Sequence, residues 1–111
     1  MAQYSFVVIS DAVPGREEEY NAWYTERHLK DVLKVPGFVA ARRFKLAQDE
    51  SKLPGRYLAL YEIETDDAQA ALADLVSRAG TPDMVMSEAM DMSKVSATLF
   101  AAIGEKQTVA R

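Results

Sequence analysis

Two observations predict a fold of the α+β class for this sequence, of the ferredoxin-like type, with two helices on one face of a four-stranded antiparallel sheet. Segments typical of strands and helices follow one another in the order β-α-β-β-α-β, which is the split-βαβ arrangement. The chain has 111 residues, a length that suits one domain with one modest hydrophobic core. We therefore expect a single domain over residues 1–104, followed by a polar C-terminal tail over residues 105–111.

Four segments have the composition of strands, because β-branched and aromatic residues are concentrated in them and turn-forming residues bound them. These segments are Tyr4–Ile9, Phe38–Leu46, Arg56–Glu64 and Val95–Ile103. The polar segment Ala47–Gly55 separates the second strand from the third. We expect these two strands to pair as an antiparallel hairpin.

Two other segments have helical character. An amphipathic pattern covers residues from about 16 to 34 and ends at Pro36-Gly37, because proline disfavours helical geometry in the residue before it. Residues 67–78 carry an apolar stripe at helical spacing and are followed by Gly80. The segment between this second helix and the last strand has only a weak pattern, and it holds four of the five methionines.

Both faces of the predicted sheet are rich in apolar side chains. In the first strand Tyr4, Phe6 and Val8 point to one side and Val7 and Ile9 to the other. Two helices cover only one face of such a sheet, and an exposed apolar sheet face is an association site. We therefore expect a homodimer, a dimeric α+β barrel in which two copies pack through this second face. The alternative is that β-propensity alone placed these residues there.

Composition argues against several classes of partner. A net charge of -4 with no basic stripe argues against a nucleic-acid partner. No apolar run reaches the ~18 residues that span a bilayer, and no secretory signal pattern is present, so we expect a cytoplasmic protein with no membrane partner. With no cysteine and one histidine, we expect no protein-ligated metal and no cofactor.

His28 is the only histidine in the chain. At about 100° between successive residues of a helix, its side chain falls within the apolar arc of the first helix. One interpretation is a buried imidazole that is bonded to a neighbour. The other is an acid or base that faces a cavity between helix and sheet.

Arg42 shares one side of the second strand with Phe38, Ala40 and Phe44, which are all apolar. An arginine that faces the interior requires an anion or a network of acceptors. One interpretation gives it a partner within the protein (Asp11, Glu62 or Glu26), and the other gives it a substrate carboxylate or enolate. On the latter interpretation Arg42 is a second catalytic residue. The opposite interpretation places Arg42 on the solvent side, and a β-bulge would also change its orientation.

Aromatic and flexible apolar side chains are further candidates for a ligand pocket. Tyr24, Tyr57 and Tyr61 are typical core residues that could also present a hydroxyl group to a ligand. Methionines such as Met86 suit an adaptable wall over a small apolar or aromatic molecule, or plain packing. Trp23 falls on the charged side of the helix, which favours a surface or subunit-contact anchor.

The first helix and second strand resemble those of the EthD-like proteins in the dimeric α+β barrel superfamily. The segments that carry the resemblance are Asn21–Leu29, Val35–Phe38 and Ala41–Phe44. The resemblance implies a ferredoxin-like subunit, a homodimer with its sheets face to face, and a pocket in which His28 matches the characteristic helix histidine. Lys30 stands where a proline often follows the His-Leu pair, which predicts a more regular first helix.

These observations leave three functions open. The first is a cofactor-independent enzyme that carries out proton transfer, cyclisation, dehydration or isomerisation on a small apolar carbonyl or aromatic compound. There His28 moves a proton while Arg42 or a tyrosine stabilises an enolate. The second is a small haem-associated monooxygenase with His28 as axial ligand or base, since relatives with this fold include monooxygenases and haem-handling proteins. The third is a non-catalytic ligand-binding or structural dimer.

Overall fold

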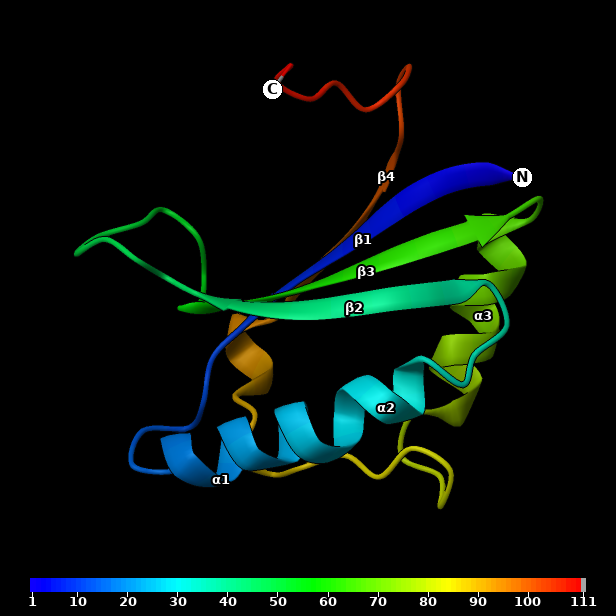
Figure 1. Cartoon of the computed structure of the whole chain (residues 1–111). Helices are drawn as coiled ribbons and strands as arrows, with labels where there is room; N and C mark the ends of the chain where they lie inside the picture. The colour runs from blue at the N-terminus through cyan, green and yellow to red at the C-terminus, as the bar shows by residue number, and fades with distance from the viewer. Residues whose placement is uncertain (111) are drawn as a thin grey trace.

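A four-stranded antiparallel sheet forms one layer of the molecule, and the longer helices lie on one of its faces (Figure 1). The structure, a computed structural model, describes residues 1–110. The strands lie in the order β2-β3-β1-β4. Their bounds are Ala2–Ser10 for β1, Phe38–Lys45 for β2, Tyr57–Thr65 for β3 and Ser96–Ala101 for β4. The predicted α+β, ferredoxin-like fold and the β2–β3 hairpin are therefore confirmed.

The first helical segment is interrupted by a π-helical turn. It consists of α1 (Glu17–Trp23), the π turn η1 (Tyr24–His28) and α2 (Leu29–Val32). The prediction of one regular helix here is wrong, because the backbone changes to the wider π spacing immediately before Leu29. Single π turns inside helices are rare and occur frequently at functional sites, and this one ends at the only histidine.

The other two helical elements follow β3. The helix α3 spans Ala68–Arg78 and packs on the same face of the sheet as the first helical segment (Figure 1). The Asp67 carboxylate caps α3 by accepting a hydrogen bond from the backbone N–H of Ala70. An irregular segment then leads to the short 3-10 helix η2 (Met92–Lys94) and into β4.

Strand β2 contains an irregularity that decides which of its side chains face the helices. Phe38 pairs with Ile63, but Ala40 pairs with Glu62, the residue directly before Ile63, so β2 holds one residue more than its partner. Such a bulge exchanges the two faces of a strand beyond it. Arg43 accordingly lies against the first helical segment, and Arg42 points the other way and is exposed.

The core lies between the sheet and the helices and is rich in aromatic side chains. Tyrosines from α1, η1 and β3 meet there with apolar residues from the loops. The largest fully buried side chains are Tyr20, Tyr24, Tyr61, Ile63, Met84, Val32 and Val35. Aromatic pairs such as Tyr20–Tyr24, with ring centroids 5.6 Å apart, add edge-to-face attraction to the burial of their apolar area.

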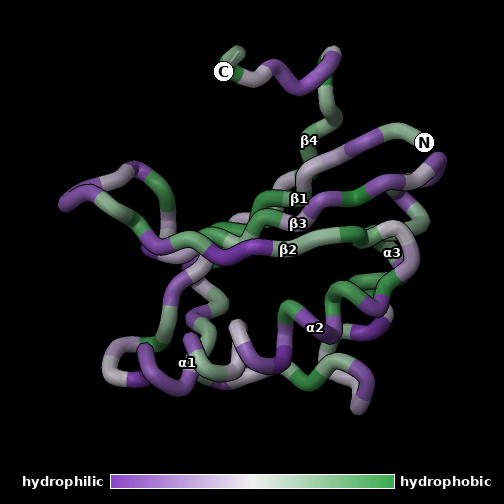
Figure 2. The backbone as a smooth tube through the Cα atoms, viewed as in Figure 1, coloured by the Kyte–Doolittle hydropathy of each residue, from purple (hydrophilic) through white to green (hydrophobic). Residues whose placement is uncertain are grey.

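Among residues 1–110 no helix covers the opposite face of the sheet (Figure 1), and hydrophobic residues are frequent along the strands (Figure 2). Alternation along the strands places on this face the side chains of Val7, Ile9, Phe44, Leu58, Leu60 and Phe100. Phe44 and Phe100 are both substantially exposed in the single chain. No helix within residues 1–110 has the length and apolar character needed to cross a bilayer.

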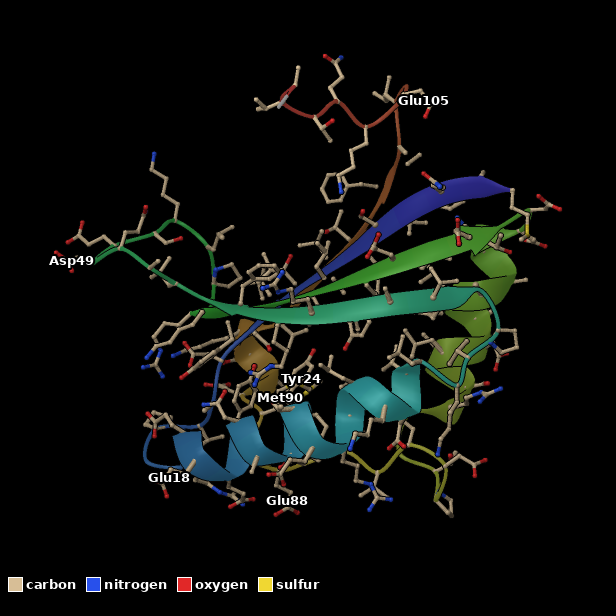
Figure 3. All side chains as sticks on the ribbon, in the orientation of Figure 1. Glu18, Tyr24, Asp49, Glu88, Met90 and Glu105 are labelled. Atoms are coloured by element: carbon tan, nitrogen blue, oxygen red, sulfur yellow. The ribbon has the colours of Figure 1, made fainter. Side chains whose placement is uncertain are left out.

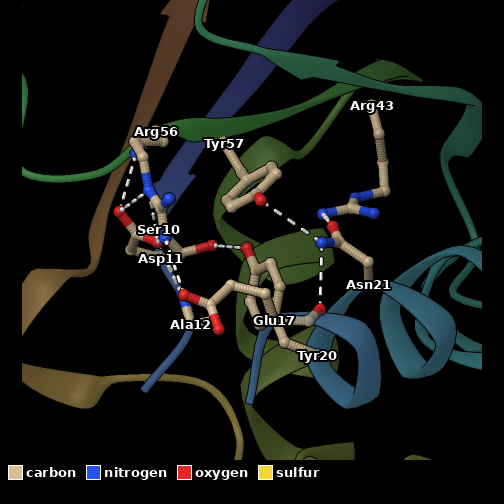
Figure 4. Close-up of polar contacts among 9 residues, drawn as sticks. All are labelled: Ser10, Asp11, Ala12, Glu17, Tyr20, Asn21, Arg43, Arg56 and Tyr57. Carbon is tan, nitrogen blue, oxygen red and sulfur yellow. Dashed lines mark hydrogen bonds and ion pairs between the residues drawn. The ribbon is translucent and has the colours of Figure 1, made fainter. Parts of the chain in front are cut away.

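A buried ion pair fixes the base of the loop between β2 and β3. Asp11 is buried, and its carboxylate accepts hydrogen bonds from Nε and Nη2 of Arg56 at 2.7–3.1 Å and from two backbone N–H groups (Figure 4). Burial by itself raises the pKa of the Asp11 carboxyl group, but the hydrogen bonds and charge of Arg56 bring it below its ordinary value. Gly55 lies directly against the backbone of Ser10, where a side chain would overlap it.

Candidate functional site

A cavity of about 230 Å³ lies between the π turn, the sheet and the methionine-rich segment of residues 84–92. Its lining is almost entirely apolar. The side chains that close it include Phe6, Leu75, Met84, Met90, Val95 and Ala97. Figure 3 shows Tyr24 and Met90 in the space between the first helical segment and the sheet. The polar groups that reach this lining belong to His28, Tyr24 and Tyr61.

His28 is held in the lining by aromatic neighbours. Its ring stacks on the indole of Trp23 with centroids 4.6 Å apart and planes 23° apart. Tyr24 meets the same ring edge-on, with centroids 5.0 Å apart. His28 is 8% exposed, and its Nδ1 atom has no hydrogen-bond partner among residues 1–110. The expectation of a buried histidine is confirmed, and this nitrogen is not occupied by a structural contact.

Burial keeps the His28 imidazole uncharged. Removal from water disfavours the protonated ring and lowers the pKa of His28 from its ordinary 6.5 to about 4, although the negative charge of Asp31 acts in the opposite direction. Asp31 is itself buried, with Arg27 and Lys34 at 3.6 and 3.8 Å. A neutral ring is able to accept a proton or a hydrogen bond from a bound molecule.

Two tyrosine hydroxyl groups meet in the same lining. The Tyr61 hydroxyl donates a hydrogen bond of 3.5 Å to the Tyr24 hydroxyl. Burial raises the pKa of Tyr24 to about 12, and burial together with the nearby Tyr24 raises that of Tyr61 further. Both groups are therefore protonated at neutral pH and act as hydrogen-bond donors.

The methionine-rich segment is attached to the first helical segment through Trp23. The indole Nε1 donates a hydrogen bond of 2.9 Å to the backbone carbonyl of Val85. This position differs from that of a free surface anchor, because the π turn and the contact with residues 84–92 bring the indole onto His28. Its contact with the histidine was missed from the sequence, since a regular helix places the two residues on different faces.

The structure brings some of the predicted site residues together and separates others. Tyr24, Tyr61 and Met86 line the cavity with His28, whereas Arg42 and Tyr57 do not. The expectation of an inward-facing Arg42 is wrong because of the bulge in β2, and its guanidinium lies over the exposed ring of Phe44. Tyr57 lies beside Arg43 instead. Within residues 1–110 no group of three or more acidic, histidine or cysteine side chains is placed to hold a metal ion.

A larger hollow of about 480 Å³ lies at the end of the sheet where β2 begins. Its lining includes Pro36, Glu64, Asp67 and Asp74. It is open to solvent and contains none of the predicted site residues. We therefore regard the smaller cavity, which combines apolar walls with a few convergent polar groups, as the candidate site.

No protein-family model matches the sequence, and no curated protein matches it either. Solved structures match it over nearly the whole chain. A candidate monooxygenase from Shewanella loihica PV-4 has a TM-score of 0.61 at 14% identity, covering 95% of this chain and 99% of that chain. The haem degrader MhuD from Mycobacterium tuberculosis has a TM-score of 0.61 at 18% identity, covering 94% and 99%.

An EthD family protein from Bacillus halodurans C-125 is a weaker match, with a TM-score of 0.48 at 15% identity, covering 96% of this chain and 100% of that chain. At such identities a structural likeness establishes the fold and leaves the reaction open. The two matches with a TM-score of 0.61 show that the chain shares their ferredoxin-like α+β fold, the fold that the sequence predicts.

Proposed function

We propose that this chain is a cofactor-independent enzyme that moves a proton on a small, largely apolar carbonyl or aromatic compound. The observation that carries the proposal is the place of His28. It is an uncharged imidazole in the wall of an otherwise apolar cavity. A volume of about 230 Å³ lies below the ~300–1,000 Å³ of pockets for drug-sized ligands, which favours a small substrate.

In the proposed reaction neutral His28 accepts a proton from the carbon next to a substrate carbonyl. The electron pair of that C–H bond moves toward the carbonyl oxygen and forms an enolate. The hydroxyl group of Tyr24 donates a hydrogen bond to this oxygen, where negative charge develops, while the Tyr61 hydroxyl donates to Tyr24. His28 then returns the proton, either to another carbon in an isomerisation or to a leaving hydroxyl group in a dehydration.

Exchange of hydrogen for deuterium tests the proton transfer directly. Ligands are first found by thermal shift in a panel of aromatic acids, lactones and phenols. Each carbonyl ligand is then incubated with the protein in D2O, and loss of its C–H signal is followed by proton NMR. We expect catalysed exchange by the native chain and a loss of about 100-fold or more in His28→Gln, with Arg42→Gln unchanged. Equal exchange in the native chain and in His28→Gln would exclude His28 as the group that moves the proton.

We also propose that the protein is a homodimer, joined through the sheet face that carries no helix. Support comes from the apolar residues at the centre of that face and from the exposed rings of Phe44 and Phe100. An apolar face of this kind is ordinarily covered in solution. The symmetric contact between two identical faces is the simplest closed arrangement.

A haem-associated oxygenase is the alternative function, because MhuD carries two haems in its active site. The neutral imidazole of His28 is a suitable axial ligand. The rest of the cavity does not fit a haem, because it holds about 230 Å³ and no arginine or lysine among residues 1–110 reaches its lining to meet the propionate groups. Titration with haem tests this, since a Soret shift that disappears in His28→Gln would favour the alternative.

A further inference from the structure

A second polar feature lies outside the His28 cavity, around the side chain of Arg43. The guanidinium of Arg43 is surrounded by the rings of Tyr20, Tyr24 and Tyr57, with its carbon 4.6–5.5 Å from their centroids. It donates hydrogen bonds of 2.9 Å from Nη1 to Thr25 Oγ1 and from Nη2 to Asn21 Oδ1. The aromatic faces and these two oxygens hold the cation in one position.

This half-buried cation has no countercharge among residues 1–110. The ion pairs among residues 1–110 include neither Arg43 nor Lys45. Both partners of the Arg43 guanidinium are neutral, and a guanidinium has five N–H donors. In contrast, Arg56 is neutralised by the buried Asp11 (Figure 4). An anionic ligand would supply the countercharge that this partly desolvated guanidinium lacks and would accept its remaining hydrogen bonds.

An open groove of about 260 Å³ lies beside this cation. It is lined by Asn21, Arg43, Phe44, Lys45 and Tyr57, and no acidic side chain in the described part of the chain contributes to it. Figure 4 shows the Arg43 guanidinium next to the Asn21 amide, which in turn points to the Tyr57 hydroxyl. The Asn21 Nδ2 group donates to the Tyr57 hydroxyl oxygen at 3.3 Å. That leaves the Tyr57 proton free to donate into the groove.

The groove and the His28 cavity are separate. Tyr24 lies between them, with the Arg43 guanidinium against one part of its ring and the His28 imidazole against another. None of the residues that line the groove lines the cavity. A ligand in the groove therefore meets cationic and hydroxyl donors, whereas a ligand in the cavity meets apolar walls.

We propose that this groove is an oxyanion-binding site, in which Arg43, Lys45 and the Tyr57 hydroxyl bind the carboxylate or phosphate group of a small molecule. The planar guanidinium suits such groups because it presents several N–H donors in one plane. Lys45 adds electrostatic attraction for the oxyanion but does not fix the geometry of its hydrogen bonds. The site is independent of the proton-transfer chemistry proposed for His28, and it remains testable if that chemistry is absent.

The test is a titration of the native chain with sodium acetate, sodium benzoate and inorganic phosphate at constant ionic strength, with chloride as the reference anion. Binding is followed through the NMR signals of the Asn21 side-chain amide and the Arg43 Nε–H group. We expect saturable shifts confined to the groove. Saturation by acetate and benzoate alone identifies a carboxylate site, and saturation by phosphate alone identifies a phosphate site.

Matched variants then separate the site from general charge attraction. Arg43→Gln should weaken binding about tenfold or more, because it removes a charge-assisted contact, and Tyr57→Phe should weaken it less. Arg42→Gln removes the same charge from the neighbouring residue on the other face and should leave the affinity within about twofold. His28→Gln should also leave it unchanged.

The proposal is overturned if none of the three oxyanions saturates, or if Arg42→Gln weakens binding as much as Arg43→Gln. Binding that is lost in His28→Gln would place the anion in the apolar cavity and would equally overturn it. If Arg43→Gln does not fold, Lys45→Gln and Tyr57→Phe serve in its place. Oxyanion titrations of the native chain that shift NMR signals elsewhere but leave the Asn21 side-chain amide unchanged decide against the site.

Discussion

The indole of Trp23 lies 4.6 Å from the imidazole of His28, nearly parallel to it, and donates its N–H to the carbonyl of Val85. One side chain thus joins the wall of the cavity that carries the histidine to the wall that carries the methionines. A shift of either wall would change the orientation of the imidazole. Trp23 is therefore expected to position His28 without contacting the reacting atoms.

Replacing Trp23 tests this role. Trp23→Leu should lower the free energy of unfolding by about 1–3 kcal/mol, since it removes an aromatic stack and a hydrogen bond. It should also increase amide hydrogen exchange in residues 84–92. Trp23→Phe keeps a ring but has no N–H, so it should restore part of the stability while exchange in this segment stays fast. Unchanged exchange in both variants would show that Val85 is held by other contacts.

The buried imidazole of His28 predicts a stability that depends on pH. The pKa of His28 is lowered to about 4 in the folded chain against an ordinary 6.5, so between these values the unfolded chain binds the proton more readily. Stability is therefore full above about pH 6.5 and falls as the pH falls. From about pH 7.5 to about pH 5 the loss should reach about 2 kcal/mol.

Urea unfolding at the two pH values measures this loss, and His28→Gln should remove most of it. Asp11 does not produce the same effect, because its pKa lies below the ordinary 3.8 and its contribution is lost only at lower pH. A decrease of equal size in the variant would assign the pH dependence to other groups.

The ion pair at the base of the β2–β3 loop predicts an unequal cost for two arginines. Arg56→Gln should lower the free energy of unfolding by about 2 kcal/mol, because it leaves the buried Asp11 carboxylate without its charged partner. Arg16→Gln breaks the exposed pair with Glu19 and should cost less than about 1 kcal/mol. Chemical denaturation of both variants at neutral pH compares them, and equal costs would contradict the structural role of the buried pair.

The sheet face without helices predicts the effect of a single charge on assembly. Leu60→Glu places a carboxylate at the centre of the proposed contact between two copies, so it should convert a dimer into a monomer while the circular dichroism spectrum is kept. Leu33→Glu makes the same exchange on the helix layer and should leave the mass unchanged. Light scattering coupled to gel filtration measures both, and a native chain that is monomeric at all concentrations would contradict the proposed homodimer.

Much of the fold is predictable from the sequence because it depends on patterns that repeat along the chain. Alternating apolar residues define the strands, and Pro36-Gly37 ends the first helical segment as expected. His28 was placed in the interior by its helical angle alone, and the structure buries it with Tyr24. Each of these predictions averages over several residues, so small local errors do not change the result.

The features that could not be predicted each depend on one residue of spacing. The bulge in β2 exchanges Arg42 and Arg43 between the two faces, and the π turn brings Trp23 onto His28. Neither irregularity has a composition that distinguishes it from its neighbours, because both result from how the segment fits the rest of the sheet and core.

The bulge in β2 also affects how this chain is compared with relatives. Strict alternation counted from Phe38 would place Arg42 on the helix side of the sheet. Alternation counted from Ala40, after the bulge, places Arg43 there, as the structure shows. An alignment that matches an arginine to Arg42 or Arg43 by position alone would therefore equate a solvent-facing side chain with one enclosed by tyrosines. A homologue of unchanged length whose β2 paired regularly from Phe38, without the bulge, would turn Arg42 inward in place of Arg43 without any substitution.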